Sequence, residues 1–162
     1  MSTEEWNVEH FEAMMQVNYM GAVRVMHEIL PYFEKEKKGH WIWNARLSSY
    51  FGRPLGGGYS APKAALLNLA ESLQPELSVK GIQLQVINHG FVKTRLTQKN
   101  NFDMPELMSP EEAAEKIIKG MKNTQRFEIH FPFKLSTFLQ ALRLLPYRVS
   151  LALTKKMLQK ES

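Results

Sequence analysis

Residues 61–88, APKAALLNLAESLQPELSVKGIQLQVIN, predict a helix followed by a buried strand. Alanine and leucine dominate residues 61–80, Gly81 is a typical residue after a helix end, and residues 82–88 have the composition of a strand. Upstream, apolar residues at intervals of three and four over residues 8–37 predict a long amphipathic helix before a short aromatic strand at 40–46. Strands that alternate with helices of this length indicate an α/β layer fold with a parallel sheet.

The C-terminal half continues this alternation. Ser109-Pro110-Glu111-Glu112 predicts a helix start, with a capping serine, a proline at the first helical position and acids in the first turn. Residues 127–131 predict a third strand, and two apolar helical stretches separated by Pro146 follow it. Because three parallel strands leave an edge and an apolar face uncovered, we expect the chain to form part of a larger domain.

The composition excludes several classes of protein and site. The chain has 162 residues, 44% hydrophobic and 23% charged, which is ordinary for one globular core. It contains no cysteine, which excludes disulfides, thiol nucleophiles and thiolate metal sites, and Asp103 is its only aspartate. The histidines have no metal-ligand spacing and no Gly-x-Ser-x-Gly elbow occurs, so we expect neither a metal site nor a serine hydrolase. No secretory signal or membrane span is evident, and we expect a cytoplasmic protein.

The residues best suited to catalysis are residues 59–63, where the predicted helix begins. In Tyr59-Ser60-Ala61-Pro62-Lys63 the tyrosine and the lysine are four positions apart, so a helix would place them on one face. A neighbouring ammonium lowers the pKa of a phenol towards the range of a general acid or base. A hydroxyl from Ser48 or Ser49 could then hold a substrate oxygen. Since Tyr-x-x-x-Lys also arises by chance, an exposed helix pair is the alternative.

Four motifs in fixed order resemble the C-terminal part of the short-chain dehydrogenase/reductase family, over about residues 6–157. Asn18 in VNYMGAV is similar to the family's helix asparagine, with Gly21 three residues later. The strand HWIWNA leads to Ser49, which is followed at the family's spacing by Gly52, and YSAPKAAL carries the tyrosine and lysine. The strand IQLQVIN with HGFVKT is similar to the segment at the nicotinamide end of the cofactor.

The resemblance implies a fold and a function. The fold would be an incomplete doubly wound (Rossmann-type) parallel sheet with flanking helices, and the activity an NAD(P)-dependent interconversion of a carbonyl and an alcohol. Tyr59 would exchange a proton with the substrate oxygen, Ser49 would orient that oxygen, Lys63 would hold the nicotinamide ribose, and Asn18 would position a water. The residues expected to bind NAD or NADP are Tyr59, Lys63, Gly90, Val92 and Thr94.

The chain departs from the family pattern in three places. The family's glycine-rich turn has no counterpart before Trp6, so residues 1–162 are expected to be a single partial domain, with 131–162 a helical extension. The interval from Ser49 to Tyr59 is a few residues short, and His89 stands where the family has proline. A rival interpretation takes the glycines of residues 52–58 as the phosphate turn. The alternative function is a non-catalytic fragment or pseudoenzyme that serves as a dimerisation or membrane-surface module.

The partners expected from the sequence follow from charge and apolar stripes. The net charge is +5, and residues 119–162 hold nine basic against two acidic side chains, without a nucleic-acid motif. The basic, apolar segment 131–160 predicts either packing on the domain or contact with an anionic membrane surface. The helices at 8–37 and 61–80 predict a homodimer. The residues expected to form an apolar lid over a lipophilic substrate are Phe102, Met104, Leu107 and Met108.

Overall fold

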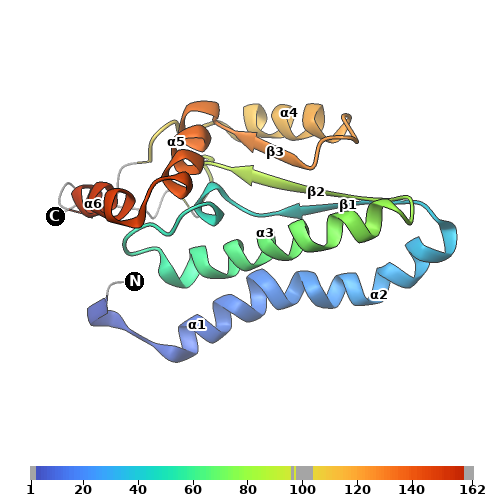
Figure 1. Ribbon diagram of the computed structural model, residues 1–162, viewed down its shortest axis with the longest axis horizontal. Helices are drawn as coiled ribbons and strands as arrows, with labels where there is room; N and C mark the ends of the chain where they lie inside the picture. Colours follow the sequence, from blue (N-terminus) through green and yellow to red (C-terminus); the bar gives the residue numbers. More distant parts are fainter. Residues whose placement is uncertain (1–2, 96, 98–103, 159–162) are drawn as a thin grey trace.

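The computed structural model describes residues 3–95, 97 and 104–158 (Figure 1). Its N-terminal helices are η1 (Thr3–Glu5), α1 (Val8–Met15), the π-helical segment η2 (Gln16–Met20) and α2 (Gly21–Glu36). The predicted helix at 8–37 is therefore present, with a π-helical turn in its middle that apolar spacing did not indicate. Asn7 caps it by accepting from the His10 backbone N–H, which satisfies one of the unpaired donors of the first turn.

The sheet has three parallel strands in the order β1 (Gly39–Asn44), β2 (Ile82–His89) and β3 (Glu128–Phe131). Trp43 pairs with Val86, and Val86 pairs with Glu128, so all three strands end at the same edge of the sheet. Parallel neighbours require crossover connections, and α3 (Gly57–Ser78) and α4 (Pro110–Met121) supply them. The predicted α/β class with a parallel sheet and flanking helices is confirmed.

Helices cover both faces of the sheet. α1, α2 and α3 lie on one side and α4 lies on the other, while α5 (Phe133–Leu144) and α6 (Tyr147–Leu158) lie towards the end at which the strand arrows point (Figure 1). The central strand is the most buried part of the fold, because Leu84 and Val86 have no exposed surface. They pack with Trp43, Leu66 and Ala70 in the main core. Burial of this kind is the dominant favourable contribution to folding.

The C-terminal helices differ in how they pack. α5 contacts β3 and buries Leu139 and Leu142 in the main core, which is the packing alternative of the two predicted for this segment. α6 buries Ser150 and Thr154 and leaves Leu151 exposed. No helix in the described part of the chain is long and apolar enough to cross a membrane.

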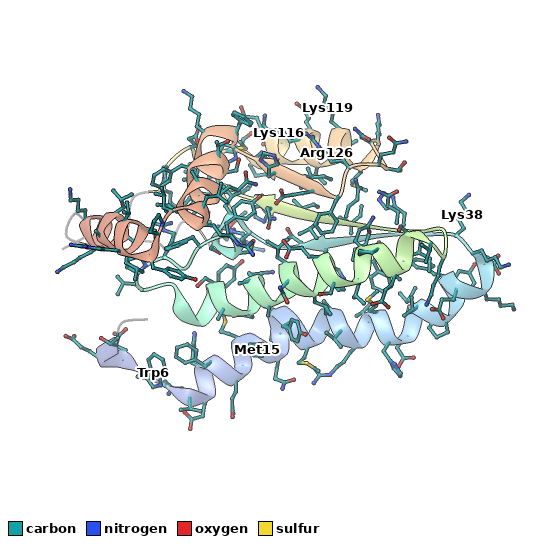
Figure 2. All side chains as sticks on the ribbon, in the orientation of Figure 1. Trp6, Met15, Lys38, Lys116, Lys119 and Arg126 are labelled. Atoms are coloured by element: carbon teal, nitrogen blue, oxygen red, sulfur yellow. The ribbon has the colours of Figure 1, made fainter. Side chains whose placement is uncertain are left out.

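Basic side chains lie on both sides of the sheet. Figure 2 shows Lys116, Lys119 and Arg126 around α4 and the loop that precedes β3, and Lys38 beyond the end of α2. The α1–α3 layer also exposes apolar side chains, among them Val17 and Tyr32 at 74% and 63% exposure. The dimer expected through this layer stays a prediction, as does contact of the basic segment with a membrane.

A glycine at the start of β2 provides a test of the packing between α2 and the sheet. Gly81 has a φ of +73°, and a Cβ atom there would collide with the carbonyl oxygen of Lys37. Gly81→Ala should lower the free energy of unfolding by about 2 kcal/mol, because strain at positive φ adds to the steric conflict. Urea denaturation of the two proteins measures the difference.

Gly57→Ala is the matched control, because a Cβ atom at Gly57 meets no atom within 4 Å and the residue is helical. This variant should be neutral or more stable by up to about 1 kcal/mol. Equal stability of Gly81→Ala and the unmodified chain would contradict the described backbone at Gly81.

Candidate active site

Tyr59 and Lys63 lie one turn apart at the start of α3, as the sequence predicted. The helix begins at Gly57, earlier than the predicted residue 61, so that both residues are helical. The Lys63 Nζ atom lies 5.8 Å from the centre of the Tyr59 ring. It also donates a hydrogen bond of 2.8 Å to the Asn44 carbonyl oxygen at the last residue of β1. Lys63 is only 8% exposed, so this bond holds a buried ammonium at the carboxyl end of the sheet.

Asn18 lies in the π-helical segment η2, which packs against α3. Its Nδ2 atom donates to the Met14 carbonyl oxygen at 3.1 Å. Such single π-helical turns within α-helices are frequently found at functional sites, because they displace backbone groups from the regular ladder. Asn18 is therefore on an element that contacts the helix of Tyr59, and it is half-buried.

Arg46 is the residue that the sequence analysis missed. It lies two residues after the end of β1, and its guanidinium carbon lies 5.9 Å from the centre of the Tyr59 ring and 5.5 Å from the centre of the Phe91 ring. Arg53 lies over the same Phe91 ring at 5.7 Å. The only signal for Arg46 in the sequence is its place just after a strand that ends beside a predicted catalytic helix.

Burial and neighbouring charge together change the pKa values of Tyr59, Lys63 and Arg46. Burial raises the pKa of the Tyr59 phenol, and the positive charge of Arg46 acts against that rise. Burial lowers the pKa of the Lys63 ammonium, and Arg46 lowers it further. The pKa of Arg46 is itself lowered by burial, and Tyr59 opposes this effect. The positive charge of Arg46 therefore favours the ionised form of the Tyr59 phenol.

His89 closes the site at the end of β2. Its Nδ1 atom lies 2.8 Å from the Gly90 carbonyl oxygen, which can only accept, so Nδ1 carries the proton. The ring stacks on Phe131 with 6.3 Å between the centres. Burial first, and then the charge of Arg46, lower the pKa of His89 to about 4. His89 is therefore neutral at pH 7.

Ser49, the predicted serine of the site, takes part in a different set of contacts. It lies in η3 (Leu47–Ser49), is 6% exposed, and donates to the Asn88 Oδ1 atom at 3.0 Å. Asn88 donates in turn to the Glu128 carboxylate, which also accepts from the Tyr50 hydroxyl. Burial, and then Glu128, raise the pKa of Tyr50. Within the described part of the chain, no hydrogen bond joins Ser49 to Tyr59.

An open hollow of about 470 Å³ adjoins this second set of contacts. Ser49, Asn68 and Tyr147 are among the residues that line it. Tyr59 is not among its lining residues.

The predicted cofactor-binding residues follow β2. A Cβ atom at Gly90 would lie 2.6 Å from the Pro132 Cδ atom, so the absence of a side chain there serves packing against the start of α5. Val92 pairs with Met108 in an isolated parallel bridge. The Thr94 backbone N–H donates to the Thr97 hydroxyl at 2.8 Å, which orders this turn. Of the predicted lid, Leu107 is exposed and Met108 half-buried, and Phe102 lies outside the described residues.

The pKa of His89 predicts a pH dependence of stability. The unfolded histidine titrates near 6.5, so between about pH 6.5 and pH 4 the unfolded chain binds a proton that the folded chain excludes. The contribution of neutral His89 to the free energy of unfolding is therefore complete above about pH 6.5, and it is lost as the pH falls towards 4. The difference in unfolding free energy between the unmodified chain and His89→Gln should shrink by about 2 kcal/mol from pH 7 to pH 4.5. Parallel stability curves for the two proteins in urea titrations would contradict the assignment.

Comparisons with known proteins show which proteins the chain is similar to. The family model for short chain dehydrogenase matches residues 1–105. An uncharacterized oxidoreductase of Myxococcus xanthus is 33% identical over 138 residues, which cover 85% of this chain and 54% of the relative. An uncharacterized oxidoreductase of Staphylococcus epidermidis is 27% identical over 126 residues, 78% of this chain and 55% of the relative. The chain thus spans about half the length of these curated relatives.

Solved structures share the fold. A short-chain dehydrogenase from Burkholderia cenocepacia, in complex with NADP, is similar with a TM-score of 0.75 at 21% identity. The match covers 89% of this chain and 63% of the Burkholderia chain. An alcohol dehydrogenase from the archaeon Thermococcus sibiricus has a TM-score of 0.67 at 24% identity, with coverages of 81% and 57%. With the parallel sheet, the family-model match and the relative from Myxococcus, these findings show that the chain belongs to the short-chain dehydrogenase family of oxidoreductases.

Proposed function

We propose that this chain carries the proton-transfer centre of an NAD(P)-dependent oxidoreductase that interconverts a carbonyl and an alcohol. The observation that carries the proposal is the pairing of the Tyr59 phenol with the buried Lys63 ammonium, which is anchored on Asn44 at the carboxyl end of β1. In open parallel sheets, ligands bind at the carboxyl ends of the strands. The site therefore has both the chemistry and the place expected for this reaction.

The donors at the strand ends fit a nicotinamide cofactor. Among the described residues, the Lys63 ammonium has one acceptor, the Asn44 carbonyl oxygen, and two N–H groups remain. Those groups suit the hydroxyls of a ribose, and Gly90, Val92 and Thr94 follow the neighbouring strand on the same edge. The NADP complex of the Burkholderia structure supports the same cofactor class, with the choice between NAD and NADP left open. The cofactor, when bound, supplies or accepts a hydride.

Each residue of the proposed set does one task. Tyr59 gives its proton to the carbonyl oxygen in the reducing direction and takes a proton from the alcohol in the other. Lys63 holds the ribose, and Asn18 on the adjoining η2 positions a water that restores the proton of Tyr59. Ser49 completes the proposed set as the residue that would orient the substrate oxygen; in the structure its hydroxyl donates to Asn88.

Replacing the phenol tests the function. Tyr59→Phe should lower turnover of carbonyl compounds with NADPH or NADH by about 10²- to 10⁴-fold, because it removes the proton donor and little else. The assay follows the loss of reduced-nicotinamide absorbance over a panel of aldehydes and ketones. Cofactor affinity, measured by calorimetry, should change only a few-fold.

Tyr32→Phe is the matched control, since Tyr32 is 63% exposed on α2 and should keep full turnover. Turnover of Tyr59→Phe within a few-fold of the unmodified chain would contradict the role of the phenol. An unmodified chain that neither binds nor oxidises reduced nicotinamides would instead support the non-catalytic alternative.

A further inference from the structure

We propose that the Arg46 guanidinium, which lies over the Tyr59 ring, holds the negative charge formed at Tyr59 and the substrate oxygen. This inference rests on the proposed function. The Ser49 hydroxyl donates to Asn88 within a buried polar cluster. The Arg46 guanidinium lies over the phenol ring.

The position of Arg46 is set by packing on two rings. The guanidinium carbon lies 5.9 Å from the centre of the Tyr59 ring and 5.5 Å from the centre of the Phe91 ring, and the side chain is half-buried. Contacts of this type with aromatic faces favour arginine over lysine, and they strengthen as water is removed. The backbone of Arg46 is extended, which carries the side chain off the end of β1 towards the start of α3. Arg46 is therefore held beside the phenol by its surroundings.

The other titratable groups at this end of α3 are each engaged differently. Lys63 on α3 donates to Asn44, and neutral His89 at the end of β2 is bonded to Gly90. Arg53, in the loop before α3, lies over the far ring, Phe91. On α1, His10 lies beside Gly58, where a Cβ atom would be 3.4 Å from the imidazole, and η2 contributes the uncharged Asn18. The Arg46 guanidinium carbon and the Lys63 Nζ atom lie 5.9 Å and 5.8 Å from the centre of the Tyr59 ring, and the charge of Arg46 lowers the pKa of Tyr59 against the effect of burial.

A guanidinium suits the chemistry of this site. When the carbonyl is reduced, its carbon gains a hydride from a dihydronicotinamide, its oxygen gains the Tyr59 proton, and the phenol becomes a phenolate. A water then returns the proton. The negative charge passes from the substrate oxygen to the phenolate, and a cation beside both positions stabilises it throughout. Because arginine does not lose its proton in proteins, Arg46 supplies this charge at any working pH.

The test measures the ionisation of Tyr59 in the chain without cofactor. Tyrosine labelled with ¹³C at Cζ gives a resonance that follows the pH, and the signal missing from Tyr59→Phe identifies Tyr59. Arg46→Gln should raise the pKa of Tyr59 by about 1 pH unit, because the nearby positive charge is lost. Arg46→Lys should return part of that change, since it restores charge without the planar contact.

Arg53→Gln is the matched control, because it removes a neighbouring arginine that lies over Phe91 rather than Tyr59, and it should leave the pKa of Tyr59 in place. An unchanged pKa in Arg46→Gln, or an equal rise in Arg53→Gln, would overturn the proposal. If Arg46→Gln does not fold, the test is made in the unmodified chain by nuclear Overhauser effects between the Arg46 side chain and the Tyr59 ring protons. Their absence would overturn the proposal. None of these measurements depends on turnover, so a failure of the Arg46 proposal can be distinguished from a failure of the proposed function.

Discussion

The hydrogen bond from the Lys63 ammonium to the Asn44 carbonyl oxygen is the constraint on which the site depends. A buried ammonium without an acceptor costs several kcal/mol, so the bond fixes how α3 lies against the end of β1. Tyr59 is one turn earlier on the same helix, so the position of Lys63 also sets the position of Tyr59. The parallel register then places the ends of β1 and β2 side by side, which brings His89 and Gly90 to the same edge.

Burial and positive charge oppose each other around Tyr59. Burial alone would keep the phenol protonated, whereas the charge of Arg46 favours its ionised form. The same charge, with burial, keeps His89 neutral and so limits the number of cations at the site. The cluster of Ser49, Asn88, Tyr50 and Glu128 has another role, since it joins η3, β2 and β3 by hydrogen bonds between buried groups.

The order of helices and strands was predictable, because apolar spacing and the start signal at Ser109 are local properties. The structure contains the full capping box that Ser109 and Glu112 indicated. The pairing of Tyr59 with Lys63 was predictable for the same reason, since helix periodicity alone sets it. The π-helical turn at Asn18 was not, because the same residues satisfy an α-helical spacing.

The partners of Ser49 and Arg46 depend on tertiary structure. Ser49 meets Asn88 only because β1 and β2 pair in one register, and Asn88 is 39 residues away. Arg46 reaches Tyr59 because the chain leaves β1 in an extended conformation before turning into η3. Local sequence signals do not encode either arrangement, whereas the motif order was enough to indicate the family.

The central claim is that the strand ends around Tyr59 and Lys63 form a nicotinamide site. Its most direct test is a titration of the ¹⁵N-labelled chain with NADP⁺, followed by amide chemical shifts. The account predicts saturable shifts at Asn44, Arg46, Tyr59, Lys63 and Gly90, with the amides of α6 unchanged. Shifts confined to α5 and α6, or no shifts at millimolar NADP⁺ and NAD⁺, would contradict it.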